Sequence, residues 1–139
     1  MQISHLARAM LAVACTAASL APLSAQAADY PDHPISLVVG YPAGGSVDLT
    51  ARLFGEALAK QLGQSVVIEN FGGAGGTIGA QRVARAQPDG YTLMLSGSTT
   101  YTVLPALKPN LPYDPRSSFA HIAIVALAPV VLLVQNSLP

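Results

Sequence analysis

The feature that most constrains this chain is a strand that runs into a glycine-rich turn and then into a helix. Residues 35–39 are a short apolar run, residues 40–48 read Gly-Tyr-Pro-Ala-Gly-Gly-Ser-Val-Asp, and residues 47–62 carry apolar side chains at helical spacing. Glycine lets the backbone approach a ligand closely, and the first turn of a helix leaves its N–H groups without intrahelical acceptors. The segment therefore predicts a site for a small anion, a carboxylate or a phosphate. The alternative is an ordinary strand-to-helix turn in which Ser46 is the N-cap residue.

The same order of elements continues along the chain. The pattern predicts a strand, a glycine loop, a helix, a strand and a polar loop, at residues 65–69, 71–76, 77–86, 91–95 and 97–100. Strands that alternate with helices predict an α/β fold with a parallel sheet and right-handed crossovers. Ligands bind such sheets at the carboxyl ends of the strands. The loops at 41–48, 71–76 and 97–100 are therefore expected to converge on one cleft.

The last part of the chain has a different pattern. Four prolines between residues 105 and 115 exclude a long helix, and residues 111–115 are typical of a turn. Two apolar runs then flank Pro129, at residues 122–127 and 130–134. Each is short enough to be a strand, and the pair is too short and too interrupted to be a transmembrane span.

Residues 1–27 are predicted to be a secretory signal peptide. Arg8 is followed by an apolar stretch at residues 9–23 and by Ala25-Gln26-Ala27, an A-x-A cleavage site. Lipoprotein processing at Cys15 is a weaker alternative. The chain is therefore predicted to be exported. Because Cys15 is the chain's single cysteine and lies in this segment, no disulfide and no thiolate metal site are expected in the mature protein.

The charge distribution argues against a nucleic-acid partner. Without Arg8, six scattered Lys and Arg residues stand against seven Asp and Glu residues, whereas phosphate-backbone binding needs clustered cations. The glycine loop also fails as a dinucleotide motif, because Ile78 stands where the last glycine of a frame starting at Gly73 is required. No cofactor and no metal are predicted.

A few polar side chains near the loops are candidates for a role in binding. Asp48 lies in the first turn of a helix, so it either stabilises the helix dipole or accepts a hydrogen bond from a ligand. Asn70 is expected to hold the glycine loop that follows it, and the alternative is that it donates a hydrogen bond to a ligand. Ser98 lacks the G-x-S-x-G context of a hydrolase nucleophile, and His33 and His121 are expected to be structural.

With these residues in hand, the chain resembles the Bug family, the extracytoplasmic solute receptors of tripartite tricarboxylate transporters. The resemblance rests on an ordered set of motifs: residues 30–35, 41–52, 62–70, 73–79, 88–93 and 111–115. It implies a periplasmic-binding-protein-like parallel sheet with flanking helices. It also implies a two-domain receptor in the periplasm that closes on a small carboxylated solute without catalysing a reaction, with transporter subunits in the membrane as partners.

The resemblance also implies a set of ligand-binding residues. The first loop would contact the ligand through Tyr41, Ala43, Gly44, Gly45 and Asp48, with backbone donors holding a carboxylate. The third loop would add donors from Gly97, Ser98 and Thr99. Two departures from the family pattern are Tyr41, where phenylalanine is common, and Phe71-Gly72, where Arg-Pro or Lys-Pro is common.

The resemblance covers well under half of a typical family member. Residues 28–139 are therefore expected to be an incomplete first domain, which alone binds ligand weakly or not at all because the second wall of the cleft is absent. Two alternatives stay open at this stage. One is an exported α/β enzyme that acts on a carboxylated molecule through Ser98 and Asp48, and the other is a truncated remnant that does not fold stably.

Overall fold

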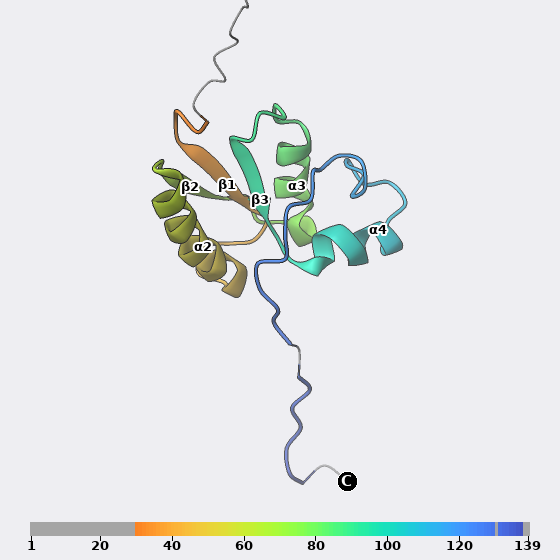
Figure 1. Ribbon diagram of the computed structural model, residues 1–139. Coiled ribbons are helices and arrows are strands. Elements are labelled where there is room, and N and C mark those ends of the chain that lie inside the picture. The colour runs from red at the N-terminus through yellow and green to blue at the C-terminus, as the bar shows by residue number, and fades with distance from the viewer. Residues whose placement is uncertain (1–29, 130, 138–139) are drawn as a thin grey trace, which may run out of the picture. The chain divides into compact units, whose positions relative to one another are not determined.

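The computed structural model describes residues 30–129 and 131–137 (Figure 1). The predicted signal peptide, residues 1–27, with Cys15 in it, lies outside the described residues. The described elements follow one another as β1 (Ile35–Val39), α2 (Ser46–Leu62), β2 (Val66–Asn70), η2 (Ala74–Gly76), α3 (Thr77–Ala84), β3 (Thr92–Leu95), η3 (Thr99–Val103) and α4 (Leu104–Leu107).

The three strands form one parallel sheet in the order β2-β1-β3. Along β1, Leu37 is in register with Ile68 of β2 and with Leu93 of β3. The central strand is buried over almost its whole length, which explains why its sequence is a nearly continuous apolar run rather than an alternating one. The predicted fold class, an α/β protein with a parallel sheet and flanking helices, is confirmed.

The two faces of β1 are covered by different helices. Leu37 and Val39 pack with Ala51 of α2 in the hydrophobic core, and Phe54 of the same helix packs against this cluster. Val38 points the other way, toward Gly79 of α3, where a Cβ would stand 3.4 Å from the Val38 Cγ1 atom. Alternate residues of a strand face opposite sides of a sheet, so α2 and α3 lie on opposite faces.

Local backbone hydrogen bonds mark the C-terminal ends of α2 and α3. The C′ residue of α2 is Gly63, in the left-handed conformation with φ 69°, and its N–H donates to the Ala59 carbonyl. Helix α3 ends at Ala84, two residues earlier than predicted. Its last turn tightens, because the Arg85 and Ala86 amides donate to carbonyls three residues back rather than four.

The two predicted C-terminal strands are absent from the described residues. Neither 122–129 nor 131–134 is part of a strand, and eight large apolar side chains in these segments are between 44% and 90% exposed. A strand needs a partner for its backbone hydrogen bonds, so apolar, β-branched sequence is not sufficient to form one. No helix in the described parts of the chain has the length and hydropathy needed to cross a membrane.

Candidate functional site

Three loops meet at the carboxyl edge of the sheet, as the sequence predicts. A Cβ on Gly97, in the loop after β3, would stand 3.1 Å from the Tyr41 hydroxyl, in the loop after β1. A Cβ on Gly72, in the loop after β2, would stand 2.8 Å from the Pro42 nitrogen. The three loops are therefore in contact with one another, and residues 42–46 of the loop after β1 are exposed.

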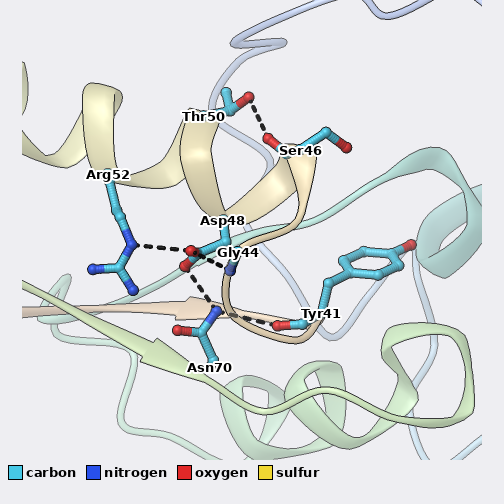
Figure 2. Close-up of polar contacts among 7 residues, drawn as sticks. All are labelled: Tyr41, Gly44, Ser46, Asp48, Thr50, Arg52 and Asn70. Atoms are coloured by element: carbon cyan, nitrogen blue, oxygen red, sulfur yellow. Dashed lines mark hydrogen bonds and ion pairs between the residues drawn. The ribbon is translucent and has the colours of Figure 1, made fainter.

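The N-terminus of α2 opens onto this edge without a side-chain cap. The N-cap residue is Gly45, with φ −80° and ψ 172°, and no side chain caps the helix. The prediction that Ser46 is the N-cap is therefore wrong: Ser46 is already the first helical residue, and its carbonyl accepts a hydrogen bond from the Thr50 hydroxyl (Figure 2). The first helical bond runs from the Leu49 amide to the Gly45 carbonyl, so the Ser46 and Val47 amides belong to the donor-rich first turn.

Asp48 lies beneath this turn and is bound from three sides (Figure 2). Its Oδ2 atom accepts hydrogen bonds from the Gly44 amide at 2.8 Å and from Arg52 Nε at 3.0 Å. Its Oδ1 atom accepts a hydrogen bond from Asn70 Nδ2 at 2.9 Å. The Asp48 side chain is only 4% exposed, whereas that of Arg52 is 52% exposed.

These contacts keep Asp48 ionised. The Arg52 hydrogen bond, followed by those from the Gly44 amide and from Asn70, lowers the pKa of Asp48 to about 2. Conversely, Asp48 raises the pKa of Arg52. Gly44 is the residue whose N–H points at the carboxylate, with φ 86°. The Asp48 carboxylate therefore accepts a hydrogen bond from a backbone amide of the loop that precedes it.

Asn70 joins the end of β2 to the loop after β1. Besides Asp48, its Nδ2 group reaches the Tyr41 carbonyl at 3.1 Å. The prediction that Asn70 holds the glycine loop after it is thus wrong, because its amide holds the loop of the neighbouring strand. The physical reason is register: Asn70 pairs with Val39, the last residue of β1, so its side chain reaches the residues that follow Val39.

A second group of contacts joins the other two loops. Thr100 is fully buried, and its hydroxyl lies 2.7 Å from the Ser96 hydroxyl and donates to the Gly75 carbonyl at 3.1 Å. The Tyr113 hydroxyl donates to the Thr100 carbonyl at 2.7 Å. This arrangement fixes η2 against η3, and no local pattern in the sequence points to it.

The remaining predicted residues lie as follows. Ala43 and Gly45 are exposed in the first loop, Ser98 is exposed before η3, and Thr99 is the first residue of η3. The polar loop at 97–100 is therefore shorter than predicted, because residues 99–103 are helical.

The two histidines each contact another part of the chain. His33 stacks on Tyr91 with ring centroids 3.6 Å apart, and His121 Nε2 lies 2.8 Å from the Pro115 carbonyl. In the described part of the chain no three His, Cys, Asp or Glu side chains are grouped to hold a metal ion.

Comparison with known families gives the context for this site. The model of the tripartite tricarboxylate transporter family receptor, TctC, matches residues 50–139. The chain belongs to this family. A UPF0065 protein of Bordetella bronchiseptica is 42% identical over 132 residues, which are 95% of this chain and 39% of that protein. BugT of Bordetella pertussis is 40% identical over 124 residues, or 88% of this chain and 37% of BugT.

Solved structures agree with the family assignment. The periplasmic binding protein BugD matches with a TM-score of 0.62 and 48% identity, over 65% of this chain and 30% of BugD. MatC from Rhodopseudomonas palustris, solved with malate, matches with a TM-score of 0.62 and 44% identity, over 65% of this chain and 31% of MatC. A third neighbour, an R. palustris protein solved with adipate, matches with a TM-score of 0.55 and 33% identity, over 63% of this chain and 29% of that protein.

These comparisons confirm the resemblance to the Bug receptors. They also show that the chain spans less than two fifths of the curated relatives' length. Of these three structures, one is a periplasmic binding protein, and the other two were solved with the dicarboxylates malate and adipate.

Proposed function

We propose that this chain forms part of the first domain of a periplasmic receptor for small carboxylates, which delivers them to a tripartite tricarboxylate-type transporter. The observation that carries the proposal is the uncapped N-terminus of α2, exposed among three converging loops in a chain of this receptor family. Backbone N–H groups and the positive end of a helix dipole favour a carboxylate at this place. The malate and adipate bound by structural neighbours support the same ligand class.

We assign the ligand-binding wall to two of the loops. Tyr41, Ala43 and Gly45 would line it together with the first-turn amides of α2, and Gly97, Ser98 and Thr99 would line it from the other side. Gly44 would act differently from the prediction, because its amide already donates to Asp48. Its contribution is the shape of the loop rather than a hydrogen bond to the ligand.

The remaining assignments follow from the same proposal. Residues 1–27 would be a signal peptide that sends the chain to the periplasm, and residues 28–139 would be an incomplete first domain. Binding would be passive, with no catalytic residue. A domain that supplies one wall of a cleft buries only part of a small ligand, so its affinity for carboxylates would be weak.

The test is an NMR titration of the ¹⁵N-labelled protein with malate, with adipate and with uncharged glucose as control. The expected result is saturable shifts of the amides at residues 45–47 and 97–99 with the two dicarboxylates and none with glucose. Absence of these shifts would refute the ligand assignment. Conversion of either compound, followed in the same tube by proton NMR, would refute the passive role.

A substitution can remove one donor without removing the helix. In Ser46→Pro the first helical residue loses its N–H, and proline is well tolerated at this position. Gly45 already has the extended backbone that a residue before proline adopts. We expect weaker malate binding with unchanged thermal stability, whereas the matched control Thr50→Val, on the same helix, should bind as the unmodified protein does.

A further inference from the structure

The loop between β1 and α2 is held from inside at two places by one side chain. Asn70 has two amide N–H donors, and Nδ2 makes two contacts, to the Tyr41 carbonyl at 3.1 Å and to Asp48 Oδ1 at 2.9 Å. These acceptors stand at the two ends of the loop (Figure 2). A single amide therefore sets the separation between the end of β1 and the start of α2.

The position of Asn70 is itself fixed by the sheet. It is the last residue of β2 and is paired with Val39, and the next amide, Phe71 N, donates to the Val39 carbonyl at 2.8 Å. The side chain thus extends from a rigid strand end, whereas Pro42, Gly44 and Gly45 in the loop it holds are exposed. Rigid elements position a binding loop more accurately than the loop can position itself.

Asp48 completes the arrangement from the helix side. Its two oxygens accept three hydrogen bonds from the protein, and with 4% of its side chain exposed it has little surface left for a ligand. The charged group that faces it is Arg52, one turn along α2, and the other two partners, Gly44 and Asn70, are neutral. The negative charge is therefore offset by Arg52, which weakens its repulsion of an anion at the helix N-terminus.

We propose that Asn70 is a positioning residue for the anion-binding loop, and that Asp48 acts with it as an internal acceptor rather than as a ligand contact. The pair holds Tyr41 and Gly44 so that the first-turn amides of α2 converge on one point before any ligand arrives. A preorganised loop loses less conformational entropy on binding. The importance of this role rests on the proposed function, but its test requires no ligand.

The test is Asn70→Ala, followed by NMR of the ¹⁵N-labelled protein without ligand. Because Asn70 is one of the groups that lower the pKa of Asp48, that pKa should rise from about 2 toward its ordinary value of 3.8. The Gly44 amide, which donates to Asp48, should shift and should exchange with solvent roughly fivefold faster, as expected for the loss of one net hydrogen bond. An unchanged Gly44 amide and an unchanged Asp48 titration would overturn the proposal.

Two further variants separate positioning from general damage. Thr50→Val removes the Thr50–Ser46 hydrogen bond from the same helix and should leave the Gly44 signal and the Asp48 titration unchanged. Asn70→Asp keeps the volume of the side chain and serves if Asn70→Ala does not fold. Its second carboxylate beside Asp48 should raise the titration midpoint of the pair and make the Gly44 amide shift with pH in a range where the unmodified protein does not. A variant that titrates as the unmodified protein does would count against the inference.

Ligand data then distinguish the two proposals. If the unmodified protein does not bind malate, the proposed function fails and the NMR result still decides the role of Asn70. If malate binds and Asn70→Ala weakens it while the Gly44 amide and the Asp48 pKa stay as they were, the function stands and the positioning role is wrong.

Discussion

Gly76 offers the sharpest test of how the loops are joined. Its φ is 91°, and a Cβ at this position would stand 2.3 Å from the Thr100 Oγ1 atom and 3.3 Å from the Ser96 Oγ atom. Thr100 is fully buried and its hydroxyl is bonded to the Gly75 carbonyl, so it has no open space into which to move. The substitution Gly76→Ala therefore combines backbone strain with a steric clash.

The expected cost is the sum of two terms. An L-residue in the left-handed region costs about 1–2 kcal/mol. Overpacking of a filled site costs about 1–3 kcal/mol more, because Thr100 must move and give up hydrogen bonds. Gly76→Ala should therefore lower the free energy of unfolding by about 2–5 kcal/mol. Gly63→Ala is the matched control, because Gly63 also has a positive φ of 69° but, apart from its chain neighbours, no residue has an atom within 4 Å of the Cβ position.

Urea unfolding followed by circular dichroism measures both variants. Gly63→Ala should cost about 1–2 kcal/mol from backbone strain alone, and Gly76→Ala clearly more. The double variant Gly76→Ala with Thr100→Ala removes the clashing oxygen, so its cost should be less than the sum of the two single costs. Equal costs for Gly63→Ala and Gly76→Ala, or strict additivity in the double variant, would refute the reasoning.

Three further outcomes are expected. Leu37→Ala, at a core position that is 2% exposed, should lower the free energy of unfolding by about 2–5 kcal/mol in the same urea assay. The folded pKa of Asp48 is lowered to about 2 from an ordinary value of 3.8, so its contribution to stability is present above pH 4 and is lost as pH falls toward 2; urea midpoints across this range should fall more steeply for the unmodified protein than for Asp48→Asn. Burial raises the pKa of Tyr101 to about 12, so the free energy of unfolding should fall as pH rises from 10 to 12. This part of the loss should be absent in Tyr101→Phe. The difference between the ultraviolet titration curves of the two proteins should show one phenol that ionises near pH 12.

The elements of the fold were predictable because their signals are local. The apolar run at 35–39 predicts β1 with the bounds that the structure has, and the glycine at 63 predicts the end of α2. A run of strand, helix, strand, helix and strand also leaves few ways to build a sheet, which is why the order of elements alone predicts that three loops meet at one edge.

The contacts that organise the site were less predictable, because they join residues distant in sequence. The Asp48–Arg52 pair was within reach of sequence analysis, since side chains four residues apart on a helix are neighbours. The bond from Asn70 to Asp48 depends on the register of β1 and β2, and that from Thr100 to Gly75 depends on where η3 begins. Neither the register of β1 and β2 nor the first residue of η3 can be predicted from local patterns in the sequence.

The apolar segments at 122–129 and 131–134 also show that a local pattern does not decide structure by itself. Their composition favours strands, yet their side chains are largely exposed and no strand forms. The match to the receptor family includes these segments and continues to residue 139. The chain spans less than two fifths of the length of its curated relatives. A strand is stabilised by its neighbours in the sheet and by cover on its faces, and both come from other segments of a polypeptide. Sequence therefore predicts the tendency of these residues to form strands, whereas their structure depends on which segments they meet.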